Sequence, residues 1–314
     1  MRAVVINDGA LRVEHREDPV AGPGDVLVAV RSAGLNSADL LQRRGFYPAP
    51  PGWPSDVPGL ELSGEVRALG AGVSGFMIGQ RVCAIVGGGA QATHCVVPAE
   101  HLISVPGGVE ITSAGGFAEG FITAYDALIT QAHLSSGERV LISGAAGGVG
   151  CSAVQVARAF GAHVIAVTRD DRHHARLRLL GAHETVTLGD VDQLEPVDVL
   201  LELVGAAHFE RAQNVLARAA RVVVIGVGSG ARVELDLLKV MNSRITVTGS
   251  TLRSRSREEK TVIARLVESE LLPLWAAASI HVPIAMSFPL DAVEEAYAAF
   301  GEPGKFGKIV LTTN

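Results

Sequence analysis

A glycine-rich turn at residues 144–150 has the residue types and the spacing to bind a phosphate group. Its sequence GAAGGVG follows the apolar run 140–143 and precedes a segment with helical apolar spacing, from Val149 to Phe160. Gly147 would let the backbone approach a pyrophosphate, and Gly150 would let the helix pack closely on its strand. The free N–H groups and the dipole of that helix would attract the anion. The predicted chemistry is therefore the binding of a dinucleotide.

The turn departs from the standard dinucleotide pattern at one position. Ala145 stands where the G-x-G-x-x-G pattern has its first glycine. A turn that merely connects a strand to a helix is therefore the alternative interpretation. The glycine turn lies between a predicted strand and a predicted helix, within a unit of about 30 residues, and this placement favours a dinucleotide-binding site.

The second strand of this unit ends beside residues that could select the cofactor. A carboxylate at that place would bind a ribose 2′-OH, whereas an arginine would accommodate a 2′-phosphate. Thr168 and Arg169 occupy the position, with His173 close behind, which favours NADPH over NADH. Asp170 and Asp171 could instead bind the unphosphorylated ribose of NADH. A solvated helix start without any cofactor contact is a third interpretation.

Strands and helices alternate around this turn. Such alternation predicts a doubly wound parallel sheet that binds its ligand at the carboxyl ends of the strands. Three turns fall at those ends, at 204–205, 226–228 and 249–251, and we expect them to form the walls of the cofactor cleft. The last strand, Ile245–Thr248, would leave an apolar sheet edge that needs covering. The predicted strands are 139–143, 163–168, 184–188, 197–204, 221–227 and 244–249.

The chain before residue 118 consists of short β-strand patterns separated by Gly and Pro, which predicts a partly open barrel. A short helix is expected from about Asn36 to Arg44, followed by a proline-rich loop. After residue 256 the pattern gives a helix, a strand, a helix and a strand, at 258–272, 280–283, 291–300 and 308–311. This segment is too short to fold alone, so we expect it to complete the first domain. The predicted domains are 1–117 with 256–314, and 118–255.

Composition excludes several functional classes. Of 314 residues, 48% are apolar and 19% charged, which excludes a disordered chain. The net charge of −6 gives no basic field for nucleic acid, so RNA binding is only a weak alternative. Cys83, Cys95 and Cys151 match neither a disulfide framework nor a zinc-finger spacing. With no signal-peptide pattern and no apolar run long enough to cross a bilayer, the sequence favours a cytoplasmic protein.

Several segments together resemble the quinone oxidoreductase (zeta-crystallin-like) branch of the medium-chain dehydrogenase/reductase superfamily, in particular its tumour-suppressor-inducible subgroup. The resemblance covers the whole chain. It implies a GroES-like β-barrel domain with a Rossmann domain, an NADPH-dependent reductase of quinones or related enones, and a homodimer paired through the strand near Ile245–Thr248. The segments are AGLNSADLLQRRGFYPAPPG (33–52), PGLELSGEV (58–66), GFITAYDAL (120–128), GAAGGVG (144–150), GSTLRSRS (249–256) and GKIVL (307–311).

The resemblance also bears on zinc. In the zinc alcohol dehydrogenases of the superfamily, the catalytic ligands sit where this chain has Asn36, Leu60 and Glu119. A neutral amide and an apolar side chain cannot supply the thiolate and imidazole donors that zinc prefers. Without such a Lewis acid a saturated alcohol is a poor substrate, whereas a quinone or enone accepts hydride without a metal. We therefore expect a zinc-free reductase.

The resemblance assigns roles to individual residues. Asn36 and Tyr47 would contact the acceptor in a pocket between the nicotinamide and the loop 36–53, Thr123 would pack on the nicotinamide, and Lys308 would lie near the cleft. Alternatively, Thr123 is a capping hydroxyl, Tyr47 a loop anchor and Lys308 a surface residue. Relatives have Lys near His173. The remaining cofactor contacts would be Ala146, Gly147, Gly148 and Val149 at the pyrophosphate, Thr168, Arg169 and His173 at the adenosine phosphate, and Val204, Gly226, Val227 and Thr251 at the ribose and carboxamide.

The predicted reaction is direct hydride transfer from NADPH to the acceptor, or transfer of single electrons, with protonation from water or Tyr47. An enoyl-thioester reductase is the alternative within enzymes. An NADPH-binding structural or regulatory protein is the alternative outside them. The basic run Arg253, Arg255, Arg257 and Lys260 is expected to be a solvated helix start, with phosphate contact as the other possibility.

Overall fold

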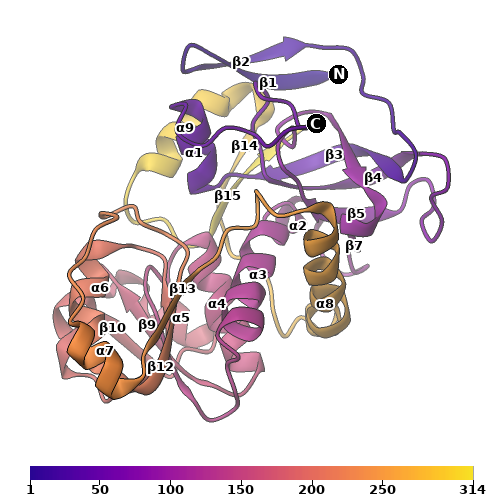
Figure 1. Cartoon of the computed structure of the whole chain (residues 1–314). Coiled ribbons are helices and arrows are strands. Elements are labelled where there is room, and N and C mark those ends of the chain that lie inside the picture. Colours follow the sequence, from indigo (N-terminus) through magenta and orange to yellow (C-terminus); the bar gives the residue numbers. More distant parts are fainter. Residues whose placement is uncertain (314) are drawn as a thin grey trace. The chain divides into compact units, whose positions relative to one another are not determined.

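The computed structural model describes residues 1–313. The chain forms two compact units, one from Met1–Ile122 with Leu252–Asn314 and the other from Thr123–Thr251. Figure 1 shows their helices and strands. None of the helices within the described residues is long and apolar enough to span a membrane.

The second unit is built on a six-stranded parallel sheet, which confirms the predicted doubly wound Rossmann fold (Figure 1). Its strand order is β10-β9-β8-β11-β12-β13, so the direction of winding reverses between β8 and β11. A sheet of this kind binds ligands at that reversal, beyond the carboxyl ends of the strands. The strands are β8 (Arg139–Ile142), β9 (His163–Thr168), β10 (Glu184–Thr187), β11 (Val197–Glu202), β12 (Leu216–Val224) and β13 (Thr246–Gly249).

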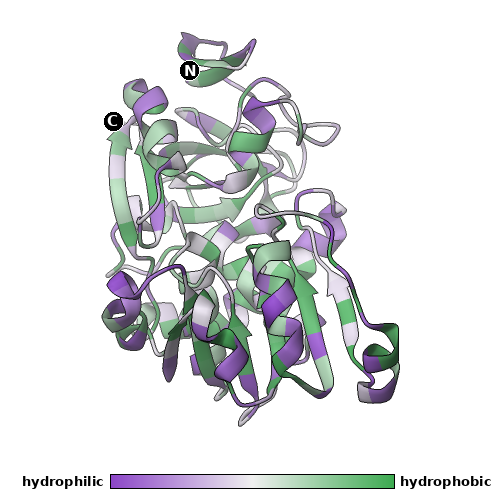
Figure 2. Cartoon of the chain, turned by 90° about the vertical axis from the view of Figure 1, so that its left-hand side faces the viewer, coloured by the Kyte–Doolittle hydropathy of each residue, from purple (hydrophilic) through white to green (hydrophobic). Residues whose placement is uncertain are grey.

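The central strands β8, β9 and β11 are almost wholly buried because both faces of the sheet are covered. Figure 2 shows that hydrophobic residues predominate along many strands and that many hydrophilic residues lie on the helices. One face packs on Phe209 and Ala212. The helical segments are η2 (Asp126–Gln131), α4 (Gly148–Ala159), η3 (Asp171–His173), α5 (His174–Leu179), η4 (Leu188–Gln193), α6 (Ala206–Ala212), η5 (Gln213–Val215) and α7 (Leu237–Ser243).

The first unit contains the predicted partly open barrel, a seven-stranded sheet with a core of buried valines and leucines. The path is β14-β15-β3-β4-β5-β7, and β6 pairs with β3. The segment after Leu252 supplies β14 and β15. The strands are β3 (Asp25–Gly34), β4 (Glu61–Leu69), β5 (Arg81–Ile85), β6 (His94–Pro98), β7 (Leu102–Ser104), β14 (Ile284–Pro289) and β15 (Lys308–Thr312), with β1 (Arg2–Asn7) and β2 (Ala10–His15) as a separate hairpin.

The helices of this unit include the short helix predicted after Asn36. A Ser256 side chain that accepts from the Glu259 N–H begins the longest one, α8, and Glu259 reaches back to complete a capping box. The last helix predicted, 291–300, is found as η6 and α9. The segments are α1 (Ser37–Arg43), η1 (Ala99–His101), α2 (Ile111–Ala114), α3 (Ala118–Tyr125, which crosses the boundary between the units), α8 (Arg257–Ala276), η6 (Leu290–Ala292) and α9 (Val293–Gly301).

One strand lies elsewhere than predicted. The sequence favoured a strand at 280–283, but β14 begins at Ile284. Pro283 has no N–H to contribute to a ladder, and its carbonyl instead accepts from the Lys308 N–H at 2.8 Å. The parallel register then starts at Ile284 opposite Lys308. The prediction was wrong because the pairing partner, not the local apolar run, sets the register.

Candidate functional site

The glycine turn lies at the carboxyl end of β8, beside the reversal of strand order. Gly147 is the N-cap residue of α4, and no side chain caps this helix start. The first N–H groups of a helix have no partner within the helix, so they remain for an anion. A Cβ at Gly150 would lie 2.4 Å from the Gly144 carbonyl oxygen, so only glycine allows this close approach of helix and turn. The structure therefore brings Ala146, Gly147, Gly148 and Val149 together at this helix start.

The carboxyl end of β9 carries the residues predicted to select the cofactor. The Thr168 hydroxyl donates to the Asp170 carbonyl at 2.7 Å and meets the His174 ring at 3.0 Å. Asp170 Oδ1 accepts from the Arg172 side chain at 2.7 Å, and this hydrogen bond lowers the pKa of Asp170. Arg169 is exposed, and among residues 1–313 no hydrogen bond or ion pair engages it. The edge thus presents an uncommitted guanidinium, while one of its two carboxylates already has a partner.

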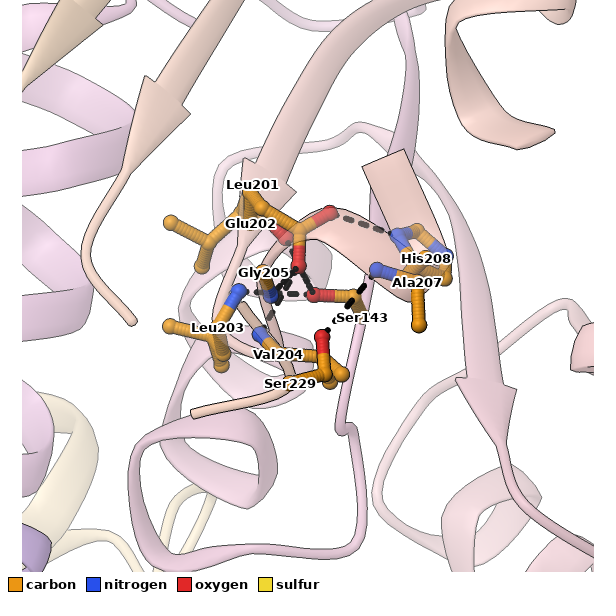
Figure 3. A network of polar contacts seen from close by, with 9 residues as sticks. All are labelled: Ser143, Leu201, Glu202, Leu203, Val204, Gly205, Ala207, His208 and Ser229. Atoms are coloured by element: carbon orange, nitrogen blue, oxygen red, sulfur yellow. Dashed lines mark hydrogen bonds and ion pairs between the residues drawn. The ribbon is translucent and has the colours of Figure 1, made fainter. Parts of the chain in front are cut away.

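A buried carboxylate stands at the end of β11 (Figure 3). Glu202 Oε1 accepts from the N–H groups of Val204 and Gly205 and from the Ser143 hydroxyl, each at 2.8 Å. Its Oε2 lies 2.5 Å from His208 Nδ1. Burial alone would raise the pKa of Glu202, but the hydrogen bonds from His208 and the turn bring it below its usual value.

This network has the residue types of a hydrolytic triad without the geometry. In such a triad the histidine joins the serine to the acid. Here Ser143 and His208 both bond to Glu202, which lies between them, and all three side chains are at most 2% exposed. The serine is therefore not activated as a nucleophile. The network instead fixes the turn after β11, because Glu202 accepts from the N–H groups of Val204 and Gly205.

The turns after β11 and β12 are bonded to each other. The Val204 carbonyl accepts from the Ser229 N–H at 2.8 Å, and the Glu202 carbonyl accepts from the Gly226 N–H at 3.1 Å. A Cβ at Gly226 would lie 2.2 Å from the Leu203 carbonyl oxygen. These bonds place the predicted residues Val204, Gly226 and Val227 on one edge of the sheet.

Two further predicted residues belong to this unit. Thr251 follows the end of β13 and is exposed. Thr123 is 6% exposed, and its hydroxyl has no hydrogen-bond partner in the described part of the chain. A buried hydroxyl without a partner is unfavourable, so this atom is available to a bound group.

The first unit contains a separate polar cluster around Lys308. The Lys308 ammonium pairs with Glu61 and donates to the Asn36 Oδ1 at 2.7 Å. Asn36 Nδ2 in turn donates to Glu61 Oε1 at 3.0 Å and to the Gly34 carbonyl at 3.3 Å. Lys308 is only 3% exposed, so it is a buried residue rather than a surface one. The cluster fixes the orientation of the Asn36 amide.

Two more carboxyl groups adjoin this cluster. Asp39 accepts from the N–H groups of Asn36 at 2.8 Å and Gly59 at 3.0 Å, and burial raises its pKa to about 6. The Glu119 N–H donates to Glu61 Oε2 at 2.9 Å. Burial and the neighbouring charge of Glu61 raise the pKa of Glu119 to about 8. Glu119 therefore holds a proton at neutral pH, whereas Glu61 pairs with Lys308.

These residues do not fit a zinc ion. Leu60 is an apolar side chain, and the Asn36 oxygen and the Glu61 carboxylate already bind the ammonium of Lys308. A cation thus occupies the donors that the site offers. Within residues 1–313 there is no group of three His, Cys, Asp or Glu side chains arranged to hold a metal ion.

Arg253 holds the loop that carries Tyr47. It is 6% exposed and donates to the carbonyls of Gly87 at 2.9 Å and Tyr47 at 2.8 Å and to Gln42 Oε1 at 2.6 Å. Its guanidinium lies 5.0 Å from the centre of the Tyr47 ring, a cation–π distance. Burial raises the pKa of the partly buried Tyr47 phenol. Arg253 is thus a buried anchor, and the expectation of a solvated arginine was wrong because residues distant in sequence supply its acceptors.

Comparisons with known proteins place these features in a family. Residues 22–131 match the alcohol dehydrogenase GroES-like domain, and residues 148–268 match the zinc-binding dehydrogenase family. The quinone oxidoreductase-like protein 2 homolog of Nematostella vectensis is 30% identical over 93% of this chain and 82% of its own length. The human quinone oxidoreductase is 28% identical over 93% and 90%.

Solved structures of related proteins match the fold of this chain. A cobalt- and zinc-bound thermostable alcohol dehydrogenase from Pyrobaculum aerophilum matches with a TM-score of 0.85 at 29% identity, over 100% of this chain and 99% of its own. A human synaptic vesicle membrane protein VAT-1 homolog-like protein matches with a TM-score of 0.86 at 26% identity, over 100% and 97%. Sequence, sheet order and barrel all lead to the same assignment. The chain belongs to the quinone oxidoreductase branch of the medium-chain dehydrogenase/reductase superfamily.

Proposed function

We propose that this oxidoreductase is an NADPH-dependent, zinc-independent reductase of quinones or related electron-poor enones. The observation that carries the proposal is the edge of the parallel sheet in the second unit. There the uncapped start of α4 lies between the turn after β9, with an uncommitted Arg169, and the turn fixed by Glu202. This combination supports a phosphorylated dinucleotide as the ligand.

The residues present fit such a cofactor. The start of α4 offers free N–H groups to a pyrophosphate. Gly226 leaves no room for a side chain, so the backbone itself forms this part of the edge, together with Val204, Val227 and Thr251. The unpartnered Thr123 hydroxyl supports its assignment as a contact to the nicotinamide.

The choice of NADPH over NADH rests on charge. Asp170 is the carboxylate that could have bound a ribose 2′-OH, but it caps the following turn and pairs with Arg172. Arg169 keeps its guanidinium free for a 2′-phosphate, next to Thr168 and His173. Asp171 is the remaining acidic residue of this turn and lies one residue farther from the strand end.

The first unit would supply the contacts to the acceptor. When bound, NADPH supplies a hydride from its nicotinamide ring. Tyr47 offers a phenol that can donate to an acceptor oxygen, on a loop fixed by Arg253. The Asn36 amide can donate as well if its long bond to the Gly34 carbonyl, 3.3 Å, is exchanged. Holding donor and acceptor in register contributes at most about 7–11 kcal/mol to the rate.

The reduced acceptor also needs a proton. Tyr47 is the proposed donor, with water as the alternative source, since the carboxyl group of Glu61 is already paired with Lys308. Because a quinone or enone takes hydride without a Lewis acid, this chemistry needs no zinc, in accord with a site whose donors bind a lysine. An assay with quinones, an enoyl thioester and a saturated alcohol as alternative substrates tests the proposal. Turnover of the thioester alone would instead indicate an enoyl-thioester reductase.

We further propose that the protein forms a homodimer through β13. This strand is the edge of the six-stranded sheet, and an unpaired edge invites pairing with a second strand. Val247 on β13 is 43% exposed, and Leu237 and Met241 on the adjacent α7 are 75% and 66% exposed. A second copy of the chain, placed by a two-fold axis, would cover this apolar edge.

A further inference from the structure

The carboxylate of Glu202 is buried, and both of its oxygens accept hydrogen bonds. Its side chain is 1% exposed and accepts two N–H groups, one hydroxyl and one imidazole (Figure 3). A carboxylate accepts only, so His208 Nδ1 must carry the hydrogen in that pair. The other nitrogen, Nε2, has no partner within residues 1–313. The ring is therefore directed by Glu202 alone.

Burying an ionised carboxylate is expensive, and an apolar residue would stabilise the core as well. The presence of a buried carboxylate at Glu202 is therefore best explained by the backbone groups that it orients. The two N–H groups that it accepts belong to Val204 and Gly205, the first residues of the turn after β11. Ser143 ties the same carboxylate to the end of β8, where it also accepts from the Leu203 N–H at 2.6 Å.

The main chain of Glu202 extends this control to the neighbouring turn. Its carbonyl accepts from the N–H groups of Ile225 at 2.9 Å and Gly226 at 3.1 Å. Gly205 has a φ of 109°, and a Cβ there would lie 2.6 Å from the Gly230 carbonyl oxygen, so the two turns pack backbone to backbone. One residue thereby sets the positions of both turns on this side of the sheet.

Strand order indicates which part of a dinucleotide these turns would meet. Arg169 at the end of β9 would bind the adenosine phosphate, and α4 at the end of β8 would bind the pyrophosphate. The strand β11 lies on the opposite side of β8 from β9. The turns after β11 and β12 are therefore left with the nicotinamide half.

We propose that Glu202 and His208 are positioning residues that hold the turns 203–205 and 226–230 for the nicotinamide half of the cofactor, an inference that rests on the proposed function. His208 contributes by donating from Nδ1, which keeps the carboxylate oriented so that its other oxygen faces Val204 and Gly205. Neither side chain touches the cofactor. Their substitution changes the binding of one half of the dinucleotide and spares the other.

The experiment measures dissociation constants by calorimetry for NADPH and for adenosine 2′,5′-bisphosphate, which represents the adenosine half alone. His208→Leu removes the donor to Glu202 and is expected to weaken NADPH binding about tenfold, the cost of one hydrogen bond to a charged group. Binding of the bisphosphate is expected to stay unchanged. His208→Asn keeps an N–H donor at the place of Nδ1, so NADPH binding should return to within about twofold of the wild-type value.

A matched control uses another histidine–carboxylate pair of the same unit. His163 Nε2 lies 2.6 Å from Glu184 Oε1 at the amino ends of β9 and β10, the opposite edge of the sheet. His163→Leu should leave both dissociation constants unchanged. Should His208→Leu fail to fold, Ser143→Ala, which removes another donor to Glu202, is measured in its place with the same expectation.

Each other outcome is informative. Equal weakening of both ligands would reveal a merely structural role and overturn the inference, as would unchanged NADPH binding in the His208→Leu and Ser143→Ala proteins. Failure of the wild-type protein to bind NADPH or NADH would instead contradict the proposed function itself. The two failures are therefore distinguishable.

Discussion

The ammonium of Lys308 lies 2.7 Å from the amide oxygen of Asn36 and also pairs with Glu61, with all three side chains at most 9% exposed. This arrangement directs the Asn36 oxygen toward the lysine and its NH₂ group toward Glu61 and the Gly34 carbonyl. One buried cation therefore both compensates a buried carboxylate and orients a side chain predicted to face the acceptor.

Removal of this cation should destabilise the first unit strongly. Lys308→Met keeps the length of the side chain but leaves Glu61 as an uncompensated buried charge, which is expected to cost about 3–5 kcal/mol of unfolding free energy. The double variant Lys308→Met with Glu61→Gln should be clearly more stable than the single one. Urea denaturation measures both. A single variant as stable as wild type would show that the pair contributes nothing.

Cofactor selectivity should depend on Arg169. Arg169→Ala removes the free guanidinium proposed to bind the 2′-phosphate, so the dissociation constant for NADPH should rise about tenfold or more, while that for NADH changes little. Arg178→Ala, which removes an exposed arginine of α5, serves as the control for overall charge. Fluorescence titration with both cofactors gives the values. Parallel losses for NADPH and NADH would exclude a selective role.

Tyr47 should affect turnover rather than cofactor binding. Tyr47→Phe keeps the ring beside Arg253 and removes the phenol that would donate a proton, so kcat should fall about 100-fold, the lower range for general acid catalysis. The dissociation constant for NADPH should remain at its wild-type value. Steady-state kinetics with a quinone decides the matter, and unchanged kcat would leave water as the proton donor.

Much of this architecture could be predicted from local pattern. The turn GAAGGVG, the apolar strands around it and the alternation with helices determine the parallel sheet, because each signal is contained within a few residues. Strand ends were less accurate. The sequence extended β11 to residue 204, but it ends at Glu202, where the side chain captures the following N–H groups.

The polar networks could not be predicted in the same way. Arg253 belongs to a basic segment that the sequence predicts to be solvent-exposed. Its hydrogen-bond acceptors are 166 to 211 residues away in the chain. Glu202 lies within an apolar strand, and its role depends on the hydroxyl of Ser143, which directly follows another strand. Such contacts are fixed by tertiary packing, and a single sequence carries no periodic signal for them.

Stability should fall with rising pH because of Glu119. Its pKa of about 8 in the folded protein exceeds the usual value of 4.5, so the unfolded chain binds fewer protons than the folded one between these values. Unfolding is therefore favoured progressively as pH rises through this window, and Asp39, with a pKa of about 6, acts in the same direction. Glu119→Gln should remove most of the decrease in melting temperature between about pH 5 and about pH 8.

The control for that variant is Glu110→Gln, at an exposed residue just before α2. It should retain the wild-type pH dependence in thermal denaturation. If Glu119→Gln and Glu110→Gln behave alike, the proton is not held by Glu119.

The proposed dimer should depend on the apolar edge at β13. Val247→Lys places a charge on this edge, which natural sheets use to prevent pairing, so the protein should become monomeric at micromolar concentration. Val262→Lys, at an exposed residue of α8, should leave the dimer intact. Light scattering coupled to gel filtration gives the mass of each. A monomeric wild-type protein would contradict the proposal.

The most direct test of the central claim is the oxidation of NADPH in the presence of phenanthrenequinone or benzoquinone, followed by the loss of NADPH absorbance, with NADH in parallel and after treatment with a chelator. The account predicts rapid turnover that prefers NADPH and survives the chelator. NADPH binding without turnover of any quinone, or turnover abolished by the chelator and restored by zinc, would contradict it.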